Sequence, residues 1–211
     1  PNVGAIVDKR YYYAKNLGEA DDNGEIFWVD LIHTDEPEFY ADSAFAVAPS
    51  LYDGAVLDFS GVEEDGDELF DDRYADAGYL VGLSTDFELL VVHLSGQSGY
   101  PDAYAVFDSQ VDFDGFDPAD DDTGGFGASF VYNADGDTKI YFTANSGQGL
   151  FELALPVAVP DSCWNAGFDT DAHGVCDVVV GIRRVSASAP TNYNDGMNCP
   201  EFFEAAPSTE P

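Results

Sequence analysis

The sequence predicts an all-β protein, and three observations carry this prediction. The apolar segments are short, rich in β-branched and aromatic residues, and bounded by Gly, Asp, Asn and Pro, which is the pattern of strands. No segment keeps a helical period over a dozen residues, although residues 67–76 could form one short helix. One strand-rich stretch also occurs twice. We therefore expect strands at residues 5–7, 11–14, 26–31, 44–48, 55–59, 79–83, 88–94, 104–107, 129–132, 139–143 and 150–155.

These strands differ in character along the chain. The first is built from small residues, the second is rich in tyrosine, and the third carries the apolar residues Phe27, Val29 and Leu31. Two weaker units follow, around residues 44–59 and 79–94, and each pairs a small-residue strand with a more aliphatic one. Residues 133–137 then read as a hairpin turn in which Gly136 can take a positive φ.

The repeat is the strongest organisational signal. Residues 8–16 return 129 positions later as residues 137–145, and the similarity extends to both flanks. The matching flank residues are Gly4-Ala5 with Gly127-Ala128, Gly18 with Gly147, and Phe27, Val29 and Leu31 with Phe151, Leu153 and Leu155 after a five-residue insertion. We expect the two stretches to fold alike.

The length of the repeat indicates a modular β architecture. The offset of 129 is three times about 43, which is close to the period of a four-stranded propeller blade. Residues 1–156 are thus expected to form β-propeller-like repeats of three to four blades, as a small propeller or as part of a larger one. A sandwich that repeats its hairpins is the alternative. Residues 157–211 are rich in Cys, Pro and Asn and are expected to form a disulfide-pinned C-terminal extension or linker.

The charge balance excludes some functions. Asp and Glu number 41 against 7 Lys and Arg, which gives a net charge of -34. Self-repulsion on this scale favours a medium in which salt or bound cations screen it. Nucleic-acid binding is excluded because it requires clustered Lys and Arg. No apolar run approaches the length of a membrane span. Because Met197 is the only methionine, we expect a piece of a longer precursor, secreted after removal of a signal peptide.

The three cysteines lie in the last quarter of the chain. In a secreted protein, Cys163 and Cys176 are expected to form a disulfide across a short loop, worth about 3 kcal/mol. Cys199 is then left unpaired or bonded to another chain. The alternative is a zinc site formed by the three cysteines and His173.

Catalytic motifs are absent from the sequence. His33, His93 and His173 stand in unrelated contexts, and no nucleophile elbow, His-Glu-x-x-His motif or phosphate loop occurs. His93 lies within a predicted strand, where a structural role is expected. The sequence therefore predicts a protein that is not an enzyme.

Calcium is the candidate cofactor, because closely spaced Asp and Asn residues supply the oxygen ligands that it prefers. The candidate ligands are Asn133, Asp135 and Asp137 in one stretch and Asp169 and Asp171 in another, and residues 120–122 form a further acidic stretch. None of them completes an EF-hand. Alternatively, these residues only form turns and solvate the surface.

Aromatic residues near the N-terminus are the candidate interface. Tyr11, Tyr12 and Tyr13 in succession put side chains on both faces of a strand, so that one face need not be core. Together with Trp28 and its neighbours they could bind sugars or another subunit. Packing between adjacent blades is the alternative.

Part of the chain resembles known extracellular proteins. Residues 137–153, with the sequence DTKIYFTANSGQGLFEL, resemble a blade of secreted β-propeller-repeat proteins. Residues 160–165 and 192–199 are similar to segments of large acidic extracellular proteins of algae, among them the glycoproteins of tubular flagellar hairs (mastigonemes) in stramenopiles. The resemblance implies an extracellular filament subunit without catalytic residues. Any glycan would be O-linked, because no Asn-x-Ser/Thr acceptor occurs.

Two function classes follow from these observations. The first is a secreted, non-enzymatic structural subunit of an extracellular filament or coat, with homo- or hetero-oligomeric partners. The second is a calcium-dependent carbohydrate-binding or adhesion module, with glycans as partners. A glycosidase or lyase on a propeller scaffold is a third alternative.

Overall fold

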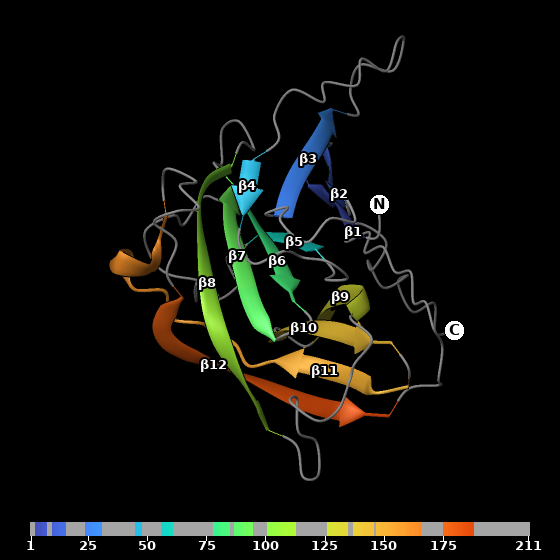
Figure 1. The fold of residues 1–211 in the computed structure, drawn as a ribbon. Coiled ribbons are helices and arrows are strands. Elements are labelled where there is room, and N and C mark those ends of the chain that lie inside the picture. The colour runs from blue at the N-terminus through green and yellow to red at the C-terminus, as the bar shows by residue number, and fades with distance from the viewer. Residues whose placement is uncertain are drawn as a thin grey trace, which may run out of the picture.

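Twelve strands, β1 to β12, make up most of the chain that the computed structural model describes, and the fold of the described residues is all-β (Figure 1). The described residues are 3–7, 10–15, 24–30, 45–47, 56–60, 78–84, 87–94, 101–112, 126–134, 137–145, 147–165 and 175–187.

The strands form three antiparallel meanders of four strands each, in sequence order. The first meander is a separate sheet of β1 (Val3–Val7), β2 (Arg10–Lys15), β3 (Gly24–Asp30) and β4 (Phe45–Val47). The second contains β5 (Val56–Ser60), β6 (Gly78–Leu83), β7 (Glu88–Leu94) and β8 (Pro101–Asp112). The third contains β9 (Phe126–Ala134), β10 (Asp137–Ala144), β11 (Gly149–Leu153) and β12 (Cys176–Ser186).

The second and third meanders share one eight-stranded sheet. Their last strands, β8 and β12, pair in parallel, which gives the strand order β5-β6-β7-β8-β12-β11-β10-β9. The sheet is curled, so that β6–β8 and β10–β12 surround a common interior (Figure 1). The first strands of the three meanders lie together, with β5 beside both β1 and β9.

All eleven predicted strands are confirmed, and the structure adds β12. Two features differ from the expected organisation. Residues 44–59 do not form one repeat unit, because β4 pairs with β3 and β5 pairs with β6 in the other sheet. Strand β12 comes from the expected C-terminal extension, yet it lies inside the sheet between β8 and β11. Separate blades within residues 1–156 and a distinct extension from residue 157 are therefore not confirmed. The short helix expected at residues 67–76 lies outside the described residues.

The two copies of the repeat have the same strand register. Tyr13 is opposite Phe27 in β2–β3, and the equivalent Phe142 is opposite Phe151 in β10–β11. The next matched pairs are Tyr11 with Val29 and Ile140 with Leu153. The prediction that the two stretches fold alike is thus confirmed at the level of backbone pairing.

The preceding Gly-Ala flanks are the exception. Ala5 is opposite Tyr12, whereas Ala128 is opposite Thr143, which corresponds to Ala14. The two dipeptides are thus shifted by two positions, and matching them residue for residue was wrong. An even shift preserves the alternation between the two faces of a sheet. Each residue of the Gly-Ala dipeptide therefore lies on the same face in both copies, but two residues further along the strand in one of them.

The core lies inside the curled sheet and is almost entirely apolar. Strands β6, β7 and β8 contribute alternate residues such as Val81, Val91 and Ala105, because successive side chains of a strand point to opposite faces. Strands β10, β11 and β12 contribute residues from the opposite side of the interior, including Ile140 and Ile182. Burial of these side chains supplies the main driving force for folding.

Four phenylalanines link the two halves of the sheet across this interior. The ring of Phe87, in the turn between β6 and β7, lies 5.3 Å from that of Phe126 and 5.7 Å from that of Phe151. The ring of Phe126 is in turn 6.2 Å from that of Phe142. These rings meet edge to face, the arrangement that the aromatic quadrupole favours.

Phe87 occupies a left-handed backbone conformation, with φ 61°. The conformation is costly for a residue with a Cβ, and hydrogen bonds around the turn hold it in place. The amide of Phe87 donates to the carbonyl of Ser84 at 3.1 Å, and the amide of Glu88 donates to Ser84 Oγ at 3.0 Å. The hydroxyl of Ser109 on β8 donates to the carbonyl of Phe87.

The connection from β11 to β12 packs against the core residues inside the curled sheet. Val157, Val159 and Trp164 are buried there, and a 3-10 turn spans Asp161–Cys163. Asn165 then pairs with β8, because its amide donates to the carbonyl of Tyr104 at 2.8 Å and the amide of Tyr104 donates back at 3.2 Å. The end of β8 that β12 does not reach is thereby hydrogen-bonded.

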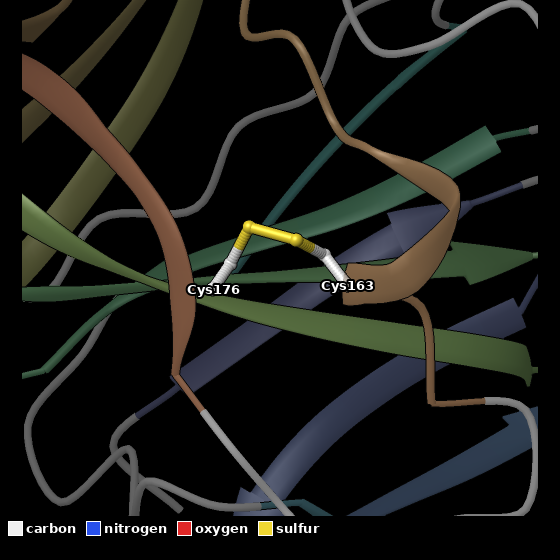
Figure 2. Close-up of a disulfide and its surroundings, with 2 residues drawn as sticks. All are labelled: Cys163 and Cys176. Atoms are coloured by element: carbon white, nitrogen blue, oxygen red, sulfur yellow. A yellow bond between two sulfur atoms is a disulfide. The ribbon is translucent and has the colours of Figure 1, made fainter.

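A disulfide joins this connection to the sheet. Figure 2 shows Cys163, at the end of the 3-10 turn, bonded to Cys176 at the start of β12. The predicted pairing is confirmed, and the alternative zinc site is wrong because two of its sulfurs are bonded to each other. No helix within the described residues is long and apolar enough to cross a membrane.

Candidate functional site

The outer face of the third meander is the part of the described structure that presents aromatic side chains to solvent. It faces away from the core because Val131 and Ile140, which are paired across β9 and β10, point inward. We define the outer aromatic face as the six residues Phe130, Tyr132, Lys139, Tyr141, Glu152 and Arg183.

Strand register brings the six residues together. Phe130, Tyr141, Glu152 and Arg183 are successive cross-strand partners on β9, β10, β11 and β12 and form one row across the sheet. Tyr132 and Lys139 are partners in the neighbouring row. Direct partners on one face have Cβ atoms about 5 Å apart, so these side chains form a continuous surface.

Two of the aromatic rings are well exposed. Phe130 is 36% exposed and Tyr132 is 49% exposed. The ring of Phe130 packs against that of Tyr141, with centroids 5.1 Å apart and planes 30° from each other. The tilted pair holds Phe130 in position, and Tyr132 extends the apolar surface toward the β9–β10 turn. Exposed aromatic surface of this kind marks an interaction site more often than scattered single residues do.

Polar groups lie along one side of the rings. Arg183 Nη2 donates to Glu152 Oε1 at 2.8 Å. The pKa of Tyr141 is raised above its ordinary value of 10.0, first by burial, then by the hydrogen bond between its hydroxyl and Glu152 and by the charge of that carboxylate. The charge of Arg183 acts in the opposite direction. Glu152 thus connects the tyrosine hydroxyl to the guanidinium.

The outer aromatic face carries positive charge on a very acidic chain. Lys139 and Arg183 are two of the seven basic residues, and with Glu152 they leave this face one positive charge. The side chain of Arg183 is 61% exposed, so most of its donors are accessible. Val179 and Val185 of β12 are also exposed and lie on either side of Arg183 along the strand.

The predicted interface of Tyr11, Tyr12, Tyr13 and Trp28 is placed only by its backbone. These residues lie on β2 and β3, where Tyr12 is directly opposite Trp28. By the repeat, Tyr12 corresponds to Tyr141 and Trp28 to Glu152, so the predicted pair occupies the same two positions as the centre of the outer aromatic face. Their side chains lie outside the described part of the structure, and their role as an interface stays a prediction.

The predicted calcium ligands are placed in part. The hairpin at residues 133–137 is confirmed, because Ala134 pairs with Asp137 and only residues 135 and 136 lie between β9 and β10. The side chains of Asn133, Asp135 and Asp137 lie outside the described residues, as do Asp169 and Asp171. Among the residues that are described, no three His, Cys, Asp or Glu side chains form a group that could hold a metal ion.

Of the remaining predicted residues, His93 is described by the structure. His93 is buried, with its ring 5.7 Å from that of Tyr79 and 6.3 Å from that of Trp164. This is the position that a structural role predicts. Cys199, His33 and His173 lie outside the described residues.

The outer aromatic face was missed in the sequence although a signal for it exists. In Phe130-Val131-Tyr132 every residue is apolar, so alternation alone does not show which side faces solvent. The partner strand resolves the ambiguity, because Lys139 and Tyr141 flank the core residue Ile140. A lysine two residues from a tyrosine marks the exposed side of the hairpin.

Comparison with known proteins finds no family model, curated protein or solved structure that matches the chain. The outer aromatic face therefore has to be judged by its chemistry. Exposed rings beside a lysine, an arginine and a carboxylate offer an apolar platform with hydrogen-bond donors and acceptors at its border.

Proposed function

We infer that the protein is a secreted, non-enzymatic structural subunit of an extracellular filament or coat. The observation that carries this inference is the threefold use of one building unit, a four-stranded antiparallel meander, with two of the units sharing a register. Chains made of like units are suited to extended assemblies, since units of one kind can stack on one another. The similarity of residues 160–165 and 192–199 to the glycoproteins of tubular flagellar hairs suggests flagellar hairs as the kind of assembly.

We further propose that the three meanders are arranged like the blades of a propeller. In a propeller, the innermost strands of the blades surround a central axis. Here the first strands of the three meanders, β1, β5 and β9, lie together, which supports β1–β4, β5–β8 and β9–β12 as three blades. Their boundaries differ from those expected in the sequence, since the third blade includes β12. The parallel pairing of β8 with β12 is an addition that separate blades do not have.

Assembly of a chain with a net charge of -34 requires screening. The inference therefore predicts filaments or sheets by electron microscopy when calcium is present at the millimolar levels of extracellular media. The same chain in chelator is expected to give dispersed particles, and light scattering should follow the change. Dispersed monomers in both media would contradict the structural role.

Cys199 offers an independent test of assembly. With Cys163 and Cys176 bonded to each other, Cys199 is the cysteine left for a bond between chains. Non-reducing electrophoresis should show linked chains, and the Cys199→Ser variant should run as a single chain. Identical mobility of the two proteins, both monomeric, would count against a covalent assembly.

A carbohydrate-binding or adhesion module is the second candidate function. The outer aromatic face favours it, because sugar rings bind to exposed aromatic faces bordered by hydrogen-bonding groups. Calcium dependence would come from the Asp and Asn stretches. The test is glycan binding with and without chelator, with Asp135→Asn/Asp137→Asn and Asp169→Asn/Asp171→Asn as the two variants. If glycan binding is the same with and without chelator and in both variants, the function does not depend on calcium.

A further inference from the structure

We propose that the outer aromatic face binds an acidic polysaccharide, with Phe130 and Tyr132 against the sugar rings and Lys139 and Arg183 on its carboxylate or sulfate groups. The proposal rests on the carbohydrate-binding function above and names its site and ligand class.

The aromatic residues provide the surface for the sugar rings. Phe130 and Tyr132 stand two positions apart on β9, so their side chains are about 7 Å apart along the strand. Both rings are exposed, and Phe130 is held by its packing on Tyr141. A surface ordered in advance loses little conformational entropy when a ligand binds.

The charged residues select an anionic ligand. Lys139 is opposite Tyr132 in one row of side chains. Arg183 lies in the neighbouring row, the row of Tyr141, and is two strands away from Tyr141. From strand spacing and rise, the two cations are about 12 Å apart. This span is comparable to a disaccharide, so successive charged sugars could reach one cation each. Arg183 keeps donors available, since the bond to Glu152 uses one of its two terminal nitrogens.

The local charge is opposite in sign to that of the rest of the chain. Two cations and one carboxylate leave this face positive, whereas the chain as a whole has a net charge of -34. At physiological ionic strength the screening length is about 8 Å, shorter than the distance between the two cations. Most of the chain's acidic residues are therefore screened from an anionic group at the face, and Lys139 and Arg183 attract it directly. Asp137, two positions before Lys139 on β10, marks the acidic border of the face.

The size of the surface argues against a second copy of the chain as the ligand. Four strands about 4.8 Å apart and two rows about 7 Å apart give a platform on the order of 100–200 Å². A stable protein–protein interface buries about 800 Å² on each partner. A short stretch of polysaccharide covers the smaller area fully, and it is the ligand that fits.

The experiment is a calorimetric titration of the full 211-residue chain at physiological ionic strength with three oligosaccharides of equal length. One is an oligogalacturonate, one is a sulfated galactan oligomer and one is an uncharged cello-oligomer. We expect binding of an anionic oligomer at least about tenfold tighter than that of the neutral one. The first two oligomers distinguish carboxylate from sulfate recognition.

Variants locate the site. Phe130→Ser/Tyr132→Ser should weaken anionic binding by about tenfold or more. Lys139→Gln should lower the preference over the neutral oligomer by about half on a logarithmic scale, since Arg183 remains. Val179→Ser is the matched control, since Val179 is exposed on β12 but outside the outer aromatic face, and it should bind like the wild type. Circular dichroism and thermal unfolding confirm that each variant folds.

Each other outcome overturns a different part of the proposal. If the wild type binds none of the three oligomers, the carbohydrate-binding function and this site both fail. If it binds but the ring and lysine variants bind equally well, the function stands and this site is wrong. Equal affinity for the neutral oligomer overturns the acidic ligand class. Concentration-dependent self-association that Phe130→Ser/Tyr132→Ser abolishes identifies a second copy as the occupant instead.

Discussion

The two halves of the curled sheet use their faces differently. Strands β6 and β7, together with residues 103–107 of β8, are buried on both sides. Residues that point away from the core, such as Leu80 and Val92, are as buried as the core residue Val91. Strands β9 to β12 bury only their inner side and leave Phe130 and Val179 exposed on the other. One half of the sheet is enclosed within the fold, and the other half forms a surface.

This difference indicates where stability and function are located. A strand buried on both faces accepts few substitutions, because any change creates a cavity or overpacks a neighbour. A strand with one exposed face can vary there at small cost in stability. We therefore expect substitutions in the core and in β6–β8 to affect folding, and substitutions on the outer side of β9–β12 to affect binding.

The largest expected effect is loss of a core ring. Phe142→Ala should lower the free energy of unfolding by about 3–5 kcal/mol, because Phe142 is fully buried against Phe126. Tyr132→Ala, on the neighbouring strand but exposed, should change it by about 0.5 kcal/mol or less. Urea unfolding of both variants measures the contrast. Similar losses for the two would contradict the assignment of inner and outer faces.

The next largest effect concerns the disulfide. Cys163→Ala/Cys176→Ala should destabilise the protein by about 3 kcal/mol, since the bond closes a loop across a sequence separation of 13 residues. Changing both cysteines avoids mispairing with Cys199. Wild type treated with a reducing agent should show a similar loss in thermal unfolding. No change on reduction would show that β12 is held by the sheet alone.

A smaller effect tests the outward side of β8. Tyr104→Phe should cost about 1 kcal/mol, because the hydroxyl of this buried tyrosine is hydrogen-bonded to Asn165 Nδ2 at 3.1 Å. The exposed counterpart is Tyr132→Phe, which should be neutral. Denaturant unfolding of the two hydroxyl deletions compares the enclosed and exposed halves without creating a cavity. A neutral Tyr104→Phe would mean that this side of β8 is accessible to water.

The smallest effect is a shift in titration on the outer aromatic face. The raised pKa of Tyr141 means that its contribution to stability is complete below pH 10.0 and is lost as the pH rises through its folded pKa. Glu152→Gln removes the carboxylate charge, so the pKa of Tyr141 should move down toward its ordinary value. Ultraviolet titration of tyrosinate, with Tyr141→Phe as the reference, measures the shift. An unchanged titration would show that burial alone raises the pKa.

Most of the fold could be predicted because its signals are local. Strand positions follow from β-branched and aromatic runs between turn residues, and the hairpin at Asp137 follows from an Asp-Gly pair. The register of the two copies could be read from the matched spacing of Phe27 and Phe151. The disulfide followed from sequence proximity, since Cys163 and Cys176 are separated by a single loop.

The rest depended on contacts between distant segments. Cys176–Ser186 contains a clear apolar run, but the composition around it indicated a tail, and nothing nearby shows that its partners are β8 and β11. Parallel pairing leaves no turn signature in the sequence. The outer aromatic face has the same origin, since Arg183 joins Glu152 only because β12 lies next to β11.

The position of β12 also sets the order in which the molecule can be completed during synthesis. Strands β8 and β11 are synthesised before β12. The backbone N–H and C=O groups that pair with β12 therefore have no strand partner until residue 186 has left the ribosome. A nascent chain that stops before this point holds two unfinished half-sheets with strand edges open to other chains. Shortening the protein from its C-terminal side should therefore produce aggregation rather than a smaller folded domain.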